Sequence, residues 1–161
     1  MVIWFIGLSG SGKTFFANKL AKKINKKKIL IDGDDVRKYI TYDLSYSIND
    51  RKKNSLLISR LCKFLENKGY VVICSILSIF KDHQKNNRKN FKKYFQIYIK
   101  SKKGDLIKKS KNKVYLKKKQ VVGKDIKFNT PYKNDLIIKN DYNKGYKLQI
   151  EKIYRKIKNE I

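Results

Sequence analysis

Residues 7–14 read GLSGSGKT and match the pattern G-x-x-x-x-G-K-[ST]. The apolar run VIWFI at positions 2–6 leads directly into this stretch, and a helical pattern over residues 13–25 follows it. A strand, a glycine turn and a helix in this order are the context in which the pattern forms a phosphate-binding loop. Its glycines let backbone N–H groups point at phosphate oxygens, and the N-terminus of the helix adds partial positive charge.

This loop predicts a site for ATP and Mg²⁺. The Lys13 ammonium is expected to contact the β- and γ-phosphates as a catalytic residue, and the Thr14 hydroxyl is expected to bind Mg²⁺. The residues predicted to bind the nucleotide are Gly7, Ser9, Gly10, Ser11, Gly12, Lys13 and Thr14. A glycine turn that binds no nucleotide is the alternative, and the flanking strand and helix argue against it.

The rest of the chain alternates strand and helix. Apolar runs predict further strands at 28–31, 70–75, 94–100 and 135–138, and helical patterns cover 50–68, 81–93, 105–110 and 147–157. This order predicts an α/β P-loop kinase fold, with a parallel β-sheet flanked by helices on both faces. A length of 161 residues fits a single domain over 1–161.

Residues 111–131 break the alternation. The segment is rich in lysine and holds one glycine and the only proline of the chain. In a kinase such a segment is a candidate for a mobile lid over the site. The composition is equally compatible with an ordinary surface loop.

The net charge of +28 leaves two interpretations open. A field of this sign attracts nucleic acids, or steers phosphorylated substrates to a cleft. Alternatively, the lysines are a solvated surface in a chain of biased composition. The second is favoured because only five of the 41 basic residues are arginine, which nucleic-acid readout sites concentrate. We expect a small-molecule partner and no specific nucleic acid.

Targeting and redox signals point to a cytoplasmic protein. The first apolar run has no basic flank, and no apolar stretch approaches the roughly 20 residues that a membrane helix needs. Cys62 and Cys74 are too far apart for a CxxC pair, so free thiols in a reducing compartment are expected. No membrane partner is expected, and a homodimer stays open.

A second polar cluster follows the strand predicted at 28–31. It reads Asp32-Gly-Asp34-Asp-Val-Arg37, at the carboxyl end of a strand, where open parallel sheets bind ligands. Asp34 can accept the proton of an acceptor hydroxyl and is the second predicted catalytic residue, with Asp32 as a structural or loop-capping residue. The planar guanidinium of Arg37 suits a phosphate or sulfate.

Arg51 and Asn54 lie three residues apart at the start of the helix predicted over 50–68, with Asp50 as its candidate cap. This spacing places the pair on one helix face. Arginine suits an anionic group, and asparagine suits the edge of a sugar or a base. Alone, the pair is equally compatible with ordinary helix surface.

Four stretches resemble the adenylyl-sulfate (APS) kinase family in register. They are GLSGSGKT at 7–14, IDGDDVR at 31–37, LSYSINDRKKN at 44–54 and VVICSILS at 71–78. The resemblance implies a phosphotransferase that moves the γ-phosphate of ATP to the ribose 3′-hydroxyl of a 5′-activated nucleotide. It implies Asp34 at that hydroxyl, and it implies acceptor contacts from Arg37, Tyr46, Arg51, Asn54, Leu77 and Ser78.

Two departures from the family pattern concern the acceptor. The motif that introduces the lid is altered at 109–115. Of the two phenylalanines with which the family sandwiches adenine, one corresponds to Tyr46 and the other to Val121. Losing one stacking face costs about 1–3 kcal/mol per base. A family relative in capsule biosynthesis phosphorylates cytidine diphosphoramidate, and its smaller base suits this pocket. That acceptor is favoured, with adenylyl sulfate as the alternative.

Two other functions compete with a kinase of this kind. One is a nucleic-acid-binding or regulatory protein that keeps the loop as a switch. The set of Asp34, Arg37, Arg51 and Asn54 argues against it, because a switch needs no acceptor pocket. The other is an inactive kinase, which the altered lid motif suggests.

Overall fold

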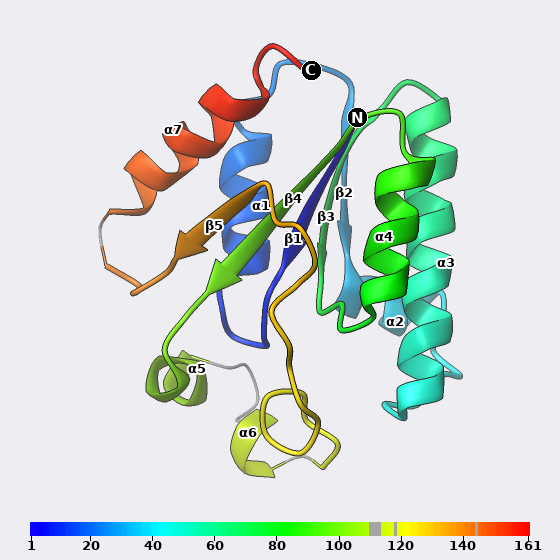
Figure 1. Ribbon diagram of the computed structural model, residues 1–161, viewed down its shortest axis with the longest axis vertical. Helices are drawn as coiled ribbons and strands as arrows, with labels where there is room; N and C mark the ends of the chain where they lie inside the picture. Colours follow the sequence, from blue (N-terminus) through cyan, green and yellow to red (C-terminus); the bar gives the residue numbers. More distant parts are fainter. Residues whose placement is uncertain (110–113, 118, 144) are drawn as a thin grey trace.

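The computed structural model describes residues 1–109, 114–117, 119–143 and 145–161. Within them, five strands form one sheet in the order β2-β3-β1-β4-β5, and every neighbouring pair is parallel. The strands are β1 (Val2–Ile6), β2 (Lys28–Asp32), β3 (Val71–Ile76), β4 (Tyr94–Lys100) and β5 (Leu136–Lys139). This sheet confirms the predicted α/β architecture (Figure 1).

β1 is the central strand because its residues are apolar on both faces. All five of its side chains are fully buried, and hydrogen-bonded neighbours, β3 and β4, lie on either side. A continuous apolar run is typical of a parallel strand covered on both faces. At the edge of the sheet, β5 alternates buried and exposed residues instead.

The helices of the described residues cover both faces of the sheet (Figure 1). One core packs Phe16, Leu20 and Ile153 against one face of β1, and the other packs Ile58 and Cys62 against the opposite face. The helices are α1 (Lys13–Ala21), α2 (Gly33–Tyr39), α3 (Ile48–Asn67), α4 (Lys81–Asn90), α5 (Lys103–Lys109), α6 (Val114–Lys117) and α7 (Tyr146–Ile157). α1 and α7 lie on one face, and α2, α3 and α4 lie on the other (Figure 1).

Helix α2 was absent from the sequence prediction, which ended strand 28–31 in a turn. The Asp32 side chain caps α2 by accepting a hydrogen bond from the Asp34 N–H, and acidic residues fill the first turn. Both features stabilise a helix start. An Asp followed by further carboxylates was therefore a usable signal for this helix.

Helix α3 begins earlier than predicted, and Asp50 is not its cap. Ser47 is the N-cap and accepts a hydrogen bond from the Asp50 N–H at 3.2 Å. The Asp50 carboxylate instead binds Ser45 Oγ at 2.5 Å. The remaining boundaries differ at element ends, most at α1, which ends at Ala21, and at α4, which ends at Asn90.

The candidate lid is partly structured. α6 lies inside the segment predicted as a lid or loop, and a bridge pairs Val122 with Ile126 across Gly123, whose φ is +90°. Of this segment, residues 111–113 and 118 lie outside the described residues, as does Ser110 of the helix predicted at 105–110. Mobility of the lid stays a prediction.

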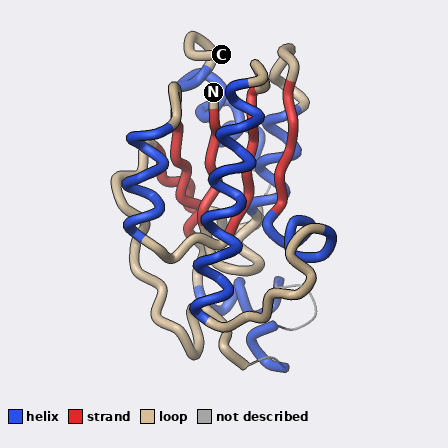
Figure 2. Tube along the Cα trace, turned by 90° about the vertical axis from the view of Figure 1, so that its right-hand side faces the viewer, coloured by secondary structure: helices blue, strands red, loops and turns tan. Residues whose placement is uncertain are grey.

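The carboxyl ends of the strands face the end of the molecule where α5 and α6 lie, and both termini lie at the opposite end (Figure 1). Seen from the side, α3 runs along the sheet and extends beyond the strand ends (Figure 2). The loops after β1, β2 and β3 therefore meet the first turns of α3 and the candidate lid at one edge.

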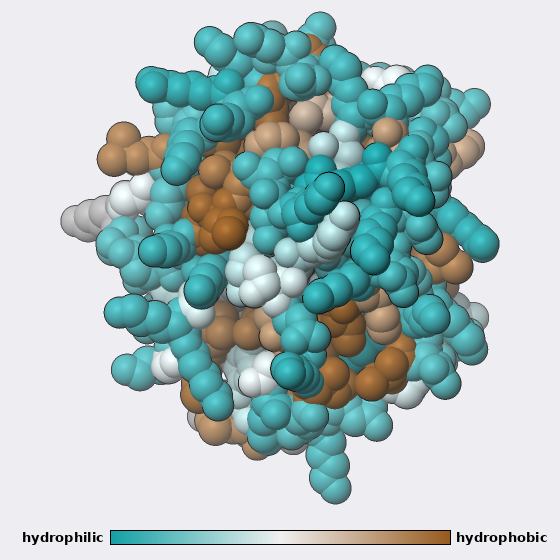
Figure 3. All heavy atoms as spheres, in the orientation of Figure 1, coloured by the Kyte–Doolittle hydropathy of each residue, from teal (hydrophilic) through white to brown (hydrophobic). Residues whose placement is uncertain are grey.

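Hydrophilic side chains cover most of the surface seen in Figure 3, with apolar residues in a few separate patches. In the described part of the chain, no helix combines the length and the apolar character that crossing a membrane requires. Cys62 and Cys74 are buried free thiols, as predicted.

Glu66 connects the end of α3 to the start of β4. Its side chain is 1% exposed and accepts hydrogen bonds from Lys63 Nζ at 2.9 Å and from the backbone N–H groups of Lys92 at 3.0 Å and Lys93 at 3.2 Å. Removing it leaves two backbone donors without their acceptor.

We expect Glu66→Ala to lower the free energy of unfolding by about 3 kcal/mol, because buried donors lose a charged acceptor. Urea denaturation followed by circular dichroism measures the change. The matched control is Glu151→Ala, since Glu151 pairs with Lys23 at 2.6 Å on the surface and exposed pairs contribute little. Equal effects of the two substitutions would contradict the role of Glu66.

Candidate active site

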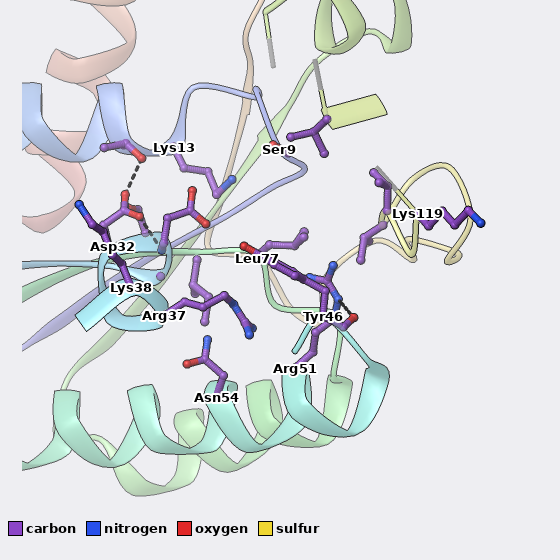
Figure 4. Close-up of a pocket in the computed structure, with 18 residues that line it drawn as sticks. Ser9, Lys13, Asp32, Arg37, Lys38, Tyr46, Arg51, Asn54, Leu77 and Lys119 are labelled. Atoms are coloured by element: carbon purple, nitrogen blue, oxygen red, sulfur yellow. Dashed lines mark hydrogen bonds between the residues drawn. The ribbon is translucent and has the colours of Figure 1, made fainter. Parts of the chain in front are cut away.

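A cavity of about 600 Å³ opens at the carboxyl edge of the sheet. It is bounded by the loop after β1, by α2, by the first turns of α3, by the end of β3 and by the candidate lid. The predicted site residues that line it are Ser9, Lys13, Thr14, Asp34, Arg37, Tyr46, Arg51, Asn54, Leu77 and Val121. Residues predicted to bind the nucleotide and residues predicted to bind the acceptor therefore share one cavity (Figure 4).

The three predicted glycines shape the loop and do not line the cavity. A Cβ on Gly7 would lie 2.6 Å from the Ile99 carbonyl oxygen, so this glycine allows the loop to pass close to β4. Gly10 and Gly12 have φ of +79° and +96°, which L side chains rarely adopt.

Two predicted serines lie behind the cavity. Ser11 is 1% exposed and Ser78 is 2% exposed, and neither lines the cavity. The Ser78 carbonyl accepts a hydrogen bond from Gln84 Nε2 at 3.3 Å. The structure thus brings Leu77 to the cavity and turns Ser78 away from it.

Asp32 joins the nucleotide loop to the sheet, beyond the capping role that the sequence suggested. Its Oδ2 accepts hydrogen bonds from Thr14 Oγ1 at 2.6 Å and from Ser75 Oγ at 2.8 Å, while Oδ1 accepts from the Asp34 N–H at 2.9 Å. Asp32 also lines the cavity. Sequence analysis missed this contact with the predicted Mg²⁺ ligand.

The oxygen atoms at this point suit Mg²⁺. The Thr14 hydroxyl and the carboxylates of Asp32 and Asp34 line one cavity and are hard donors. Among the described residues, no cluster of three or more His, Cys, Asp or Glu side chains could hold a metal alone. Mg²⁺ is commonly held by one or two carboxylates together with substrate phosphates, and the donor set fits that arrangement.

Lys13 is a partly buried cation at the base of the cavity, and its Nζ donates to the Leu8 carbonyl at 3.0 Å. Burial lowers the pKa of Lys13 to about 8, against the opposing influence of Asp34 and Asp32. A nearby phosphate would stabilise the charged form.

Two arginines surround Tyr46 on the acceptor side. The guanidinium carbons of Arg37 and Arg51 lie 4.7 Å and 5.2 Å from the centre of its ring. Arg37 donates to the carbonyls of Leu44 at 3.2 Å and Ser45 at 2.7 Å, and Arg51 Nε donates to the Tyr46 carbonyl at 2.9 Å. Both side chains are held in the cavity by neutral acceptors, which leaves their charges for an anion.

The two guanidinium groups also repel each other. Burial lowers the pKa of Arg51, and the nearby charge of Arg37 lowers it further. An arginine stays protonated in spite of such shifts. A bound phosphate or sulfate would relieve the repulsion, so the pair favours an anionic ligand.

Asn54 rises from α3 toward the cavity, below Arg37 (Figure 4). It is 4% exposed, and its Oδ1 accepts a hydrogen bond from Thr41 Oγ1 at 2.8 Å. This bond fixes the carboxamide. Because no described residue accepts from its Nδ2, that nitrogen is available to a ligand.

Asp34 lines the cavity on α2. Its negative charge opposes the lowering of the pKa of Lys13, on the nucleotide loop, and of Arg51, on α3. One carboxylate therefore stabilises the charged forms of a cation on the nucleotide loop and of a cation on α3.

Two cations of the cavity were not predicted individually. Lys38 follows Arg37 on α2, and Lys119 belongs to the candidate lid (Figure 4). The lining holds five cationic side chains and two carboxylates, a surplus of three positive charges. Both lysines are exposed, and the Lys119 side chain points away from the other labelled residues (Figure 4).

The candidate lid forms one wall of the cavity through Val121, which is 4% exposed and packs with Leu106 and Tyr115. Arg51 NH2 donates to the Gln120 carbonyl at 3.0 Å, so α3 holds this wall. Val121 makes this wall aliphatic, at the position where the sequence predicted that one aromatic stacking face is lost.

Comparisons with known proteins identify the family of this chain. Residues 1–139 match the adenylylsulphate kinase family. A cytidine diphosphoramidate kinase from Campylobacter jejuni is 33% identical over 164 residues, covering 97% of this chain and 95% of the relative. A probable adenylyl-sulfate kinase from Bacillus subtilis is 32% identical over 154 residues, covering 87% of this chain and 75% of the relative.

A solved structure of an APS kinase has the same fold. The structure of the Mycobacterium tuberculosis APS kinase in complex with AMPPNP and APS superposes with a TM-score of 0.86, at 24% identity, covering 96% of this chain and 95% of the other. Identity this low shows the fold alone, and that fold is the predicted P-loop kinase fold. With the family match over residues 1–139, it shows that the chain belongs to the adenylylsulphate kinase family and is a phosphotransferase.

Proposed function

We propose that this kinase transfers the γ-phosphate of ATP to the ribose 3′-hydroxyl of cytidine diphosphoramidate, a 5′-activated nucleotide of capsule biosynthesis. The choice of acceptor rests on one observation: Tyr46 gives the acceptor half of the cavity an aromatic wall, and Val121 gives it an aliphatic one. The Campylobacter jejuni relative, which covers 97% of this chain, is named for that acceptor.

The two walls favour a small base. Stacking of a base on an aromatic side chain contributes about 1–3 kcal/mol, and a base held by Tyr46 and Val121 gains it on one face. A purine has the larger ring system and loses more when the second aromatic face is missing. A pyrimidine therefore suits this cavity better.

On the donor side, the loop and Lys13 bind the phosphates of ATP. Lys13 places its charge at the β- and γ-phosphates, while Thr14 and Asp32 provide oxygen ligands for Mg²⁺. Bound Mg²⁺ supplies charge neutralisation at the transferred phosphoryl group. The bond between Thr14 Oγ1 and Asp32, 2.6 Å long, orients the hydroxyl so that its lone pairs remain for the metal.

On the acceptor side, Asp34 acts as general base. It accepts the proton of the 3′-hydroxyl as the oxygen attacks the γ-phosphorus. Arg37 and Arg51 hold the anionic 5′ group beside Tyr46, and Asn54 Nδ2 donates to the sugar or the base. The cavity thus provides a binding group for each part of a 5′-activated nucleotide.

A second acceptor, adenylyl sulfate, is supported by the family match over residues 1–139 and by the Bacillus subtilis relative. The two arginines suit a sulfate as well as a phosphoramidate. This acceptor would yield 3′-phosphoadenylyl sulfate. A nucleic-acid-binding role finds less support, because the acceptor residues Asp34, Arg37, Arg51 and Asn54 share the cavity with the nucleotide loop.

The acceptor choice is tested by steady-state kinetics on both nucleotides. We expect a higher kcat/KM for cytidine diphosphoramidate than for adenylyl sulfate. Val121→Phe should shift the ratio of the two values toward adenylyl sulfate by about tenfold, because it restores a second stacking face. Release of ADP measures each rate.

Two checks accompany this test. Thermal unfolding shows whether Val121→Phe keeps the fold, since Val121 is 4% exposed. Leu148→Phe is the control, because Leu148 is 79% exposed on α7 and should not change the ratio. Equal or better turnover of adenylyl sulfate by the unmutated protein would assign it to the sulfate branch.

We expect Asp34→Asn to lower kcat by at least about 100-fold while the Kd for ATP changes by less than about threefold, because the amide cannot accept the proton. Turnover at saturating ATP and calorimetric titration with ATP separate the two effects. Asp35→Asn is the control, since Asp35 is exposed and does not line the cavity. A collapse of ATP affinity would make Asp34 a nucleotide or metal ligand only.

The lowered pKa of Lys13, about 8, predicts that ATP binding takes up a proton. Phosphate raises this pKa, so at pH 8.5 the complex holds a proton that most of the free protein lacks. ATP affinity should fall by up to about tenfold per pH unit above pH 8. Calorimetry at pH 8.5 in two buffers of different ionisation enthalpy measures the uptake.

A matched variant checks the origin of this proton. In Lys13→Arg the uptake should disappear, because a guanidinium keeps its proton at this pH. ATP binding without proton uptake by the unmutated protein would contradict either the lowered pKa of Lys13 or its contact with the phosphates.

A further inference from the structure

Three side chains behind the nucleotide loop have no role in the function proposed above. They are Tyr115 on α6 and Asn140 and Tyr142 in the segment after β5, and each donates a hydrogen bond to a carbonyl of the loop. The bonds run from Tyr115 Oη to Ser9 O at 3.0 Å, from Tyr142 Oη to Gly10 O at 2.6 Å and from Asn140 Nδ2 to Ser11 O at 2.9 Å. Three successive peptide groups of the loop are therefore held by side chains more than 100 residues away in sequence.

A donor on a carbonyl also fixes the N–H of the same peptide group, because the two point in opposite directions across a trans peptide. The bond to the Ser9 carbonyl fixes the Gly10 N–H, and the bond to the Ser11 carbonyl fixes the Gly12 N–H. Neither amide donates to an acceptor among the described residues. The third bond, to the Gly10 carbonyl, holds the peptide group of the Ser11 N–H, which lies between them and donates to the Leu8 carbonyl at 3.1 Å. Backbone amides that point into a turn of this kind form a concave binding site for anions.

Both the backbone and the side chain of Asn140 make hydrogen bonds to neighbouring residues. It is 9% exposed, its backbone N–H donates to the Lys100 carbonyl at 2.8 Å, and its Oδ1 accepts from the Tyr142 N–H at 3.1 Å. A Cβ on Gly12 would lie 2.7 Å from Asn140 Nδ2. The loop and this side chain approach as closely as a glycine permits.

Tyr142 has a backbone conformation that needs support. Its φ is +61°, in the left-handed region that side chains other than glycine rarely adopt. Such a conformation persists where surrounding contacts hold it. Here the backbone N–H is bound by Asn140 and the phenol by Gly10, so the strained residue presents its hydroxyl to the loop.

Both phenols are donors at any pH used for a kinase. Burial raises the pKa of Tyr115 to about 12 and also raises the pKa of Tyr142. A protonated hydroxyl can donate to a carbonyl oxygen, whereas a phenolate would be repelled by it.

We propose that Tyr115, Asn140 and Tyr142 are positioning residues that hold three successive peptide groups of the nucleotide loop, so that the Gly10 and Gly12 N–H groups are aimed at the phosphates of ATP. This inference rests on the proposed binding of ATP at the loop. The three residues act through the backbone, so they set the affinity for the phosphate chain independently of the base. Amides oriented before the ligand arrives need no reorganisation when it binds.

The test compares ATP with inorganic tripolyphosphate, which has the phosphate chain and no base. We expect Tyr142→Phe and Asn140→Ala each to raise the Kd for both ligands by the same factor, about tenfold, because each removes one hydrogen bond that orients the loop. Tyr115→Phe should act in the same direction. In kinetic assays, KM for ATP should rise while KM for the acceptor nucleotide stays unchanged.

Tyr70→Phe is the matched control, because Tyr70 precedes β3 and packs against Lys27, away from the loop. It should leave both Kd values unchanged. Thermal unfolding without ligand identifies any variant that has lost its fold, and Tyr142→Phe, which keeps the ring, carries the test in that case.

Two results would overturn the proposal. If ATP binds more weakly and tripolyphosphate does not, the side chains contact the base and do not orient the loop. If neither Kd changes in folded variants, the bonds have no part in phosphate binding. Both results require that the unmutated protein binds ATP. Failure of the unmutated protein to bind ATP or tripolyphosphate would instead refute the proposed function, and this inference with it.

Discussion

The site depends on the carboxylate of Asp32. Its two oxygens bind Thr14 at the start of α1, Ser75 at the end of β3 and the first turn of α2. One side chain at the end of β2 therefore sets the relative positions of the nucleotide loop and α2. A half-buried carboxylate that accepts three hydrogen bonds is held more firmly than any single neutral contact would hold it. The catalytic geometry is fixed by the same contacts that join the sheet to its loops.

Charge is distributed unequally around this centre. Five cationic side chains and two carboxylates line the cavity, and the guanidinium groups of Arg37 and Arg51 both lie against one ring. The charge of Arg37 acts on Arg51, and an anionic ligand would relieve this repulsion between like charges. The binding energy of a polyanion thus includes repulsion that it removes. The chain as a whole and the lining of the cavity both carry a net positive charge. Only in the cavity do the charged groups have a defined arrangement around a candidate binding site.

The sequence predicted those parts of the site that are local. Residues 7–14 form a loop whose shape follows from its own glycines, and Arg51 and Asn54 share a helix face by their spacing. The contacts that the sequence did not reveal join distant residues: Thr14 to Asp32 across 18 positions, and Tyr142 to Gly10 across 132. None of these four residues is of a type that distinguishes such a long-range contact from a role on the surface. Helix α2 was missed for another reason, because its cap, Asp32, was interpreted as a residue of a loop, and Asp34 in its first turn was interpreted as a site residue only.

The placement of β1 at the centre of the sheet has a consequence for biosynthesis. Residues 2–6 are made before residues 71–76 and 94–100, with which they pair, and the loop that follows them is held by residues 115, 140 and 142. Pairings between segments so far apart form slowly, because a long loop must close before any contact rewards it. The nascent chain therefore carries its most apolar strand unpaired while most of its length is still being translated. The net charge of +28 opposes association between such chains, because like charges repel.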